Sequence, residues 1–165
     1  MRLTGIIHNF VNLKIIMECS RKIVSQGEAL LKYLPHRPPV LLVDTFFGRE
    51  PDASYTGYTP RRGSLFCPGD YFLEEGLIEH AAQSIALAAG LERLENQRQV
   101  EPGFVGSVNS FITYGTVPSG SPIFTVIREL YKYPGFSVLQ AEIFCKDMLV
   151  ARGELKVVKI SGSGA

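Results

Sequence analysis

The stretch GLIEHAAQSIALAAG, residues 76–90, decides the fold of this chain of 165 residues. After its first turn, alanines and larger apolar residues cover most of the circumference of a helix, which is typical of a helix enclosed by the rest of the protein. The many alanines indicate that a sheet approaches it closely. Glu79, His80 and Gln83 interrupt the apolar surface near its start. They are either the ordinary polar end of a helix or part of a site.

Segments with strand character surround this helix in the sequence. We expect a short helix at 26–33, strands at 40–50 and 54–60, a loop at 60–72, the long helix at 75–93, a strand entered through the Pro-Gly turn at 102–103, and alternating strands at 123–131, 135–146 and 148–159. In the last strand, Leu149, Ala151, Gly153, Leu155 and Val157 should share one face, with Val150 on the other. This order predicts an α+β domain in which an antiparallel sheet wraps one helix.

Composition restricts the class of protein. A net charge of +1, with the basic residues spread along the chain, gives no indication of nucleic-acid binding. Three widely spaced cysteines predict neither a disulfide framework nor a zinc site, so we expect no metal and no organic cofactor, and a reducing cytoplasm fits best.

The two ends of the chain are expected to lie outside the folded domain. Residues 1–25 are expected to be an N-terminal extension, too short and too polar to span a membrane, with a weak signal peptide as the alternative. The domain is expected at 26–160, and residues 161–165 read as a flexible tail.

Three stretches together carry a family resemblance: YLPHRPPVLLVD at 33–44, CPGDYFLEEGLIEHAAQSIALAAG at 67–90, and EPGFVGSVNSFITYGTVPSGSPI at 101–123. They resemble the β-hydroxyacyl-acyl carrier protein dehydratases. They look most like the dehydratase-like proteins of aryl polyene (flexirubin-type) pigment clusters. The resemblance spans roughly residues 30–159. It implies the hotdog fold, a homo-dimer or a hetero-dimer with a second dehydratase, and an acyl carrier protein as partner.

The resemblance also implies a site, of which half is present. In the family, a histidine just before the Phe-Pro-Gly turn is the general base, and the helix glutamate of the partner subunit helps the hydroxyl leave. Phe66 occupies the position of that histidine, and Asp70 that of a second histidine. The glutamate matches Glu79. The missing base comes either from His80 or His36 of this chain, or from a second subunit.

The remaining site predictions follow from the reaction. Glu79 in an apolar setting could stay protonated and act as the acid. Gly76 at the helix start would let a thioester carbonyl approach backbone N–H groups. Gln83, Phe66 and Phe104 are expected to contact substrate, and His36 is either structural or catalytic. Dehydration of 3-hydroxyacyl thioesters by a lyase is the leading hypothesis. An acyl thioesterase and a non-catalytic acyl-binding subunit are the alternatives.

Overall fold

The computed structural model describes residues 22–95 and 103–160. The elements are β1 (Ser25–Gln26), the 3-10 helix η1 (Gly27–Leu30), β2 (Thr45–Glu50), β3 (Ala53–Tyr58), β4 (Tyr71–Phe72), α2 (Glu74–Glu95), β5 (Gly103–Thr113), β6 (Val117–Pro118), β7 (Ile123–Tyr133), β8 (Phe136–Cys145) and β9 (Met148–Lys159). The long helix and the three C-terminal strands are confirmed. The helix predicted at 26–33 is shorter than expected. The tail at 161–165 and most of the N-terminal extension lie outside the described residues.

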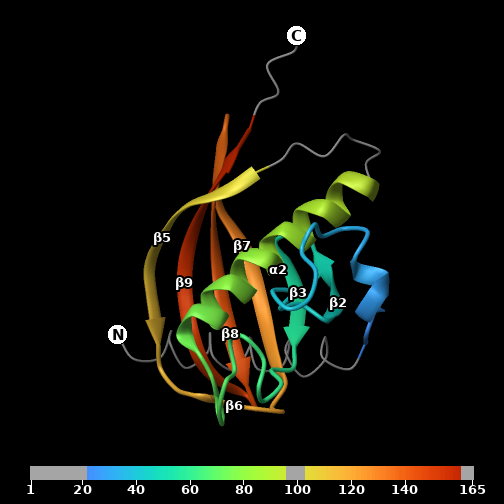
Figure 1. Cartoon of the computed structure of the whole chain (residues 1–165). Helices are drawn as coiled ribbons and strands as arrows, with labels where there is room; N and C mark the ends of the chain where they lie inside the picture. Colours follow the sequence, from blue (N-terminus) through green and yellow to red (C-terminus); the bar gives the residue numbers. More distant parts are fainter. Residues whose placement is uncertain (1–21, 96–102, 161–165) are drawn as a thin grey trace.

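The main sheet is antiparallel and has the strand order β1-β2-β3-β7-β8-β9-β5. The helix α2 crosses one face of this sheet, and the strands curve around it (Figure 1). A helix enclosed by an antiparallel sheet is the predicted α+β hotdog fold. Short β4 and β6 pair with each other beside the start of α2. In the described part of the chain, no helix is long and apolar enough to cross a membrane.

The core lies between α2 and the sheet. Leu77, Ala81 and Ile85 project from α2 at helical spacing and pack against the inward residues of β7, β8 and β9. Ile143 and Leu155 represent these strands, and both are fully buried. The small side chain of Ala81 is 0 % exposed, which agrees with the close approach of helix and sheet that the alanines predict.

The strand predicted at 40–50 begins only at Thr45, so the prediction is wrong for residues 40–44. The reason is that side chains of α2 take the place of a neighbouring strand. The N–H of Leu42 donates to Oε1 of Gln83 at 2.7 Å, and its carbonyl accepts from Nδ1 of His80 at 2.6 Å. Since both backbone groups of Leu42 are satisfied by the helix, the segment needs no strand partner.

The face assignment predicted for the start of β9 is also wrong. The pairing of β8 with β9 shifts between Ile143 and Phe144, so Ile143 lies opposite Ala151 whereas Phe144 lies opposite Leu149. This bulge places Leu149 on the face turned away from α2, and Val150 joins the core beneath the helix. One extra residue in a strand reverses the faces on either side of it.

Candidate functional site

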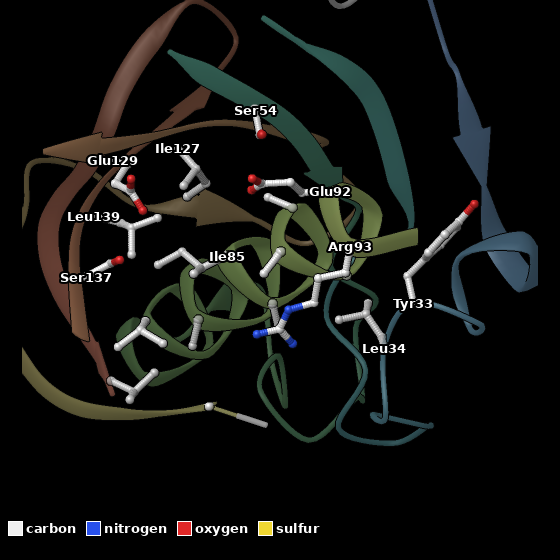
Figure 2. Close-up of a pocket in the computed structure, with 18 of the residues that line it drawn as sticks. Tyr33, Leu34, Ser54, Ile85, Glu92, Arg93, Ile127, Glu129, Ser137 and Leu139 are labelled. Carbon is white, nitrogen blue, oxygen red and sulfur yellow. The ribbon is translucent and has the colours of Figure 1, made fainter. Parts of the chain in front are cut away.

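A wide groove runs along the exposed side of α2, with a volume of about 2220 Å³. Its walls are the helix from Glu79 to Arg93, the segment 31–37, and the ends of β5, β7, β8 and β9. In Figure 2, Tyr33 and Leu34 border it on one side of the helix, and Glu129, Ser137 and Leu139 of the sheet border it on the other. Glu79 and His36 both belong to this groove.

Glu79 meets two polar side chains in the groove wall. Nε2 of Gln83 donates a hydrogen bond to its Oε1 at 2.7 Å. Nε2 of His36 lies 3.9 Å from the same oxygen. The side chains of His36 and Glu79 are 31 % and 37 % exposed, so a ligand in the groove can reach both. An acid and an imidazole therefore do lie together here, but the imidazole is that of His36.

Gln83 is fully buried, and its hydrogen bond fixes the carboxylate of Glu79 from the side away from the groove. Its Nε2 donates to the carbonyl of Val40 at 2.7 Å as well as to Glu79, and its Oε1 accepts from Leu42. An amide has two N–H donors and one oxygen acceptor, so all of these contacts are satisfied together. Gln83 thus fixes the carboxylate relative to the segment 40–42. It is enclosed behind Glu79 and does not face the groove.

The loop PHRPP places His36, and its arginine holds the loop. Arg37 donates from its guanidinium to the carbonyls of Leu31 at 3.2 Å, Leu34 at 2.7 Å and His36 at 2.8 Å. Nε2 of His36 then lies 3.9 Å from Oε1 of Glu79. Its Nδ1 is buried and has no hydrogen-bond partner among the described residues. Apart from the motif itself, no pattern in the sequence predicts this role of Arg37.

His80 lies away from the groove, inside the core. It is 0 % exposed, Nδ1 donates to Leu42, and Nε2 accepts from the hydroxyl of Thr125 at 2.7 Å. Burial lowers the pKa of His80 to about 4, against the smaller raising effects of the Leu42 carbonyl and the Asp44 carboxylate. The ring is therefore neutral at pH 7 and both nitrogens are occupied. This geometry ties the helix to the sheet and to the segment at Leu42, and keeps His80 apart from Glu79.

Phe66 and Gly76 pack against each other at the start of α2. A Cβ added at Gly76 would lie 2.6 Å from Cε2 of Phe72 and 2.9 Å from Cβ of Phe66. From the sequence, we expect a thioester carbonyl to approach the Cα of Gly76. In the structure, the side chains of Phe72 and Phe66 occupy the space beside this Cα. Phe66 is half-buried against the core. The position of the family's base histidine holds no titratable group.

The other residues considered as site candidates are more exposed. Phe104 is 54 % exposed on β5 and lines the far end of the groove together with Val105. Asp70 forms an exposed ion pair with Arg62 at 3.1 Å, outside the groove. In the described part of the chain, no group of three or more His, Cys, Asp or Glu residues could hold a metal ion.

Comparisons with known proteins relate this arrangement to a family. Residues 28–163 match the model of the ApeP-like family, described as ApeP dehydratase. No curated protein sequence matches the chain.

Several solved structures share the fold. A chain of the dehydratase heterocomplex ApeI:P from Xenorhabdus doucetiae superimposes with a TM-score of 0.68 at 20 % identity, over 81 % of this chain and 92 % of that one. The E. coli PaaI protein of the phenylacetic acid degradation operon gives 0.58 at 13 % identity, over 92 % and 98 %. A hypothetical thioesterase with coenzyme A from Streptococcus pneumoniae TIGR4 gives 0.56 at 9 %, over 70 % and 84 %. At these identities the likeness shows the fold alone.

Proposed function

Because the chain belongs to the ApeP-like dehydratase family, we propose that it dehydrates 3-hydroxyacyl thioesters on an acyl carrier protein, as one subunit of a hetero-dimer with a second hotdog protein. The product is a trans-2-enoyl thioester of fatty-acid-like or aryl polyene biosynthesis. The observation that carries this proposal is the position of Glu79, a carboxyl group in an open groove, together with the absence of a titratable group at Phe66.

In the proposed reaction, Glu79 acts as the acid. A base removes the α-proton, the α,β double bond forms, and the bond from Cβ to the hydroxyl oxygen breaks as Glu79 protonates the departing oxygen. Water leaves, the base releases the α-proton to solvent, and Glu79 takes up one proton from solvent, so that both groups return to their starting states. Gln83 supports this role because it is fixed by the backbone of residues 40–42 and orients Oε1 of the carboxyl group.

Two features of the groove support a second subunit. Its volume of about 2220 Å³ exceeds the roughly 300–1,000 Å³ of pockets that enclose a small ligand, as expected of a site with one wall missing. The side chain of Glu79 is 37 % exposed, whereas an acid that works at neutral pH is better placed in a closed, apolar site. A partner that covers the groove would supply this wall and bring the base that Phe66 lacks.

The edge strand β5 supports the same arrangement. It lies at one end of the sheet, and it exposes Phe104, Val108 and Ile112. An apolar edge strand favours pairing with another chain, because its outer backbone groups can continue the sheet. The relative from Xenorhabdus doucetiae is described as a heterocomplex, which agrees with a hetero-dimer here.

A second source of the base is favoured by one observation. His36 lies 3.9 Å from Glu79 in the same groove, and its buried Nδ1 has no partner in the described part of the chain. His36 could therefore remove the α-proton while Glu79 protonates the hydroxyl, both within one subunit. The remaining candidate is a non-catalytic subunit, because Phe66, at the position of the family's base histidine, cannot accept a proton.

One experiment separates these candidates. The chain is purified alone and with a second hotdog dehydratase from the same gene cluster, and each is given a 3-hydroxyacyl carrier protein. The loss of one water from the carrier-bound chain is followed by mass spectrometry. We expect activity only in the mixture, and a loss of about 10²–10⁴-fold with Glu79→Gln in this chain. The matched control is Glu92→Gln, since Glu92 lines the same groove about 20 Å further along α2.

Each other outcome has a definite meaning. Activity of the chain alone that is lost with His36→Asn assigns the base to His36. Undiminished activity of the mixture with both Glu79→Gln and His36→Asn leaves the chain as a non-catalytic partner and overturns the role of Glu79. Release of the free acid from the carrier indicates a thioesterase instead.

A further inference from the structure

The helix side of the groove has a charged residue at each end and apolar residues between them. Glu79 lies at one end and Arg93 at the other, and the helix between them extends about 21 Å. Apart from Glu92, the residues of α2 that line the groove between these two are small or apolar: Ala82, Ile85, Ala86, Ala88, Ala89 and Gly90. Ile127 and Leu139 line it from the sheet. The middle of the groove therefore offers an apolar surface to a hydrocarbon chain.

Arg93 extends into this groove from the last turn of α2. In Figure 2 its guanidinium group points into the groove, whereas the carboxyl group of Glu92 points toward Ser54. Helical side chains lean toward the N-terminus of their helix, so the long side chain of Arg93 lies back along the groove in the direction of Glu79. Within residues 22–95 and 103–160, the guanidinium group makes no hydrogen bond and no ion pair. Its charge is therefore available to a ligand.

A second cation lies at the same end of the groove. Lys159 is the last residue of β9 and pairs with Gly103 at the start of β5, and both residues line the groove. Side chains alternate along a strand, so Lys159 shares the helix-facing side with Leu155 and Val157. The C-terminal ends of β9 and α2 both lie at the top of Figure 1. In the described part of the chain, no carboxylate pairs with Lys159.

The other cationic side chains that line the groove already have partners. Arg37 donates to three backbone carbonyls, and Nζ of Lys32 lies 4.8 Å from the centroid of an aromatic ring. Nζ of Lys132 lies 3.5 Å from Oε1 of Glu129, and Arg49 is engaged as well. Among the described lining residues, the two cations at the end distant from the acid therefore remain available to bind an anion.

We infer that the groove binds a long acyl chain whose far end carries a carboxylate, which Arg93 and Lys159 hold. The inference rests on the proposed function, because it takes Glu79 to mark the end at which the thioester reacts. An extended carbon chain advances roughly 1.25 Å per bond at a C–C length of about 1.5 Å, so roughly sixteen bonds span the distance along the helix.

The chemistry of the far end selects the carboxylate. A carboxylate matches a guanidinium group in charge and in the spacing of its two oxygens, and the ammonium group of Lys159 adds a further donor. A methyl end would instead bring apolar atoms against two cations and displace their water without replacing its hydrogen bonds. Chains that end in an acid should therefore be preferred over methyl-ended chains of equal length.

Binding of two thioesters that cannot be dehydrated tests this preference. The probes are the N-acetylcysteamine thioesters of hexadecanedioic acid and of hexadecanoic acid, which differ at the far end and lack the 3-hydroxyl group. Each is titrated calorimetrically into the full chain mixed with the second hotdog protein. We expect the acid-ended probe to bind about tenfold more tightly. The preference should shrink at about 1 M NaCl, where the screening length is about 3 Å.

Variants of this chain assign the preference to its two cations. Arg93→Met and Lys159→Met should each reduce it, and the double change should abolish it. Arg93→Lys keeps a cation and should retain part of it, which separates the loss of charge from a loss of structure. The matched control is Lys156→Met. Lys156 lies on the same strand but on the opposite face, over the ring of Phe136, and its removal should leave the tenfold preference intact.

Three results would overturn the inference. They are equal affinity of the unmodified chain for the two probes, a preference that survives the double change, and an equal loss of affinity for both probes with Arg93→Met. In the last case Arg93 would shape the groove or bind the thioester arm. Because neither probe reacts, the preference can be measured even if the dehydration assay fails. Dehydration of methyl-ended substrates can likewise be measured if the preference is absent.

Discussion

The backbone N–H of Leu42 donates a 2.7 Å hydrogen bond to Oε1 of Gln83, forty-one residues further along the chain. The carbonyl of Leu42 is bonded by His80, one turn earlier on the same helix. Two of the polar residues that interrupt the apolar surface of α2 thus make the hydrogen bonds to the backbone of Leu42 that a neighbouring strand would otherwise make. Glu79, held by Gln83, is the one that faces the groove.

Gln83→Leu should destabilise the fold, although it leaves the volume of the side chain nearly unchanged. It removes the partners of the Leu42 N–H and the Val40 carbonyl, and each buried polar group left unpaired costs about 1–3 kcal/mol. We expect a loss of roughly 3 kcal/mol, or about 6–12 °C in Tm, by thermal unfolding. The control is Glu79→Gln, which keeps an acceptor for Gln83 and should change Tm little. Equal Tm values for Gln83→Leu and the unmodified chain would refute this role.

The buried ring of His80 should make stability depend on pH. Its pKa is lowered from 6.5 to about 4 by burial, so between these values the unfolded chain binds a proton that the folded chain does not. The free energy of unfolding therefore falls as the pH drops from about 6.5 toward 4, by on the order of 3 kcal/mol. Urea unfolding at pH 7.5 and pH 5 should show roughly 2 kcal/mol of this fall, because pH 5 still lies above the folded-state pKa. His80→Gln should lose this part of the pH dependence, and an unchanged slope in that variant would contradict the assignment.

The fold could be predicted because its signals are local. Helical spacing of apolar residues predicts α2, and alternation predicts β7 to β9. Each of these elements can therefore be predicted from the residues within it. The site was predicted only in part. Glu79 stands out because the residues around it are apolar. However, the side chain of His80 points about 100° away from that of Glu79 around the helix and lies in the core. His36 lies near Glu79 because the loop that carries it packs beside the helix. Contacts between distant segments leave no periodic signal.

Gly76→Ala should lower stability although alanine is the better helix former by about 1 kcal/mol. An added Cβ would lie 2.6 Å from the ring of Phe72 and 2.9 Å from Phe66, and overpacking of this kind costs about 1–3 kcal/mol. Thermal unfolding should therefore show a small net loss. Gly69→Ala is the control, since a Cβ at Gly69 has no atom within 4 Å. If Gly76→Ala raises Tm, the side chains of Phe72 and Phe66 move aside and the close packing is not required.

If the chain forms the proposed hetero-dimer, Val108→Lys should weaken its assembly with the second hotdog subunit without unfolding the chain. Val108 is 39 % exposed on the edge strand β5, where a buried lysine would have to lose its hydration on contact with another subunit. We expect at least about a tenfold rise in Kd, or about 1.4 kcal/mol, by analytical ultracentrifugation of the mixture. Met148→Lys adds the same charge at a more exposed apolar position in the β8–β9 hairpin, and it should leave Kd unchanged. Equal Kd values for the two variants would place the interface elsewhere on the molecule, because only β5 is expected to continue into the partner's sheet.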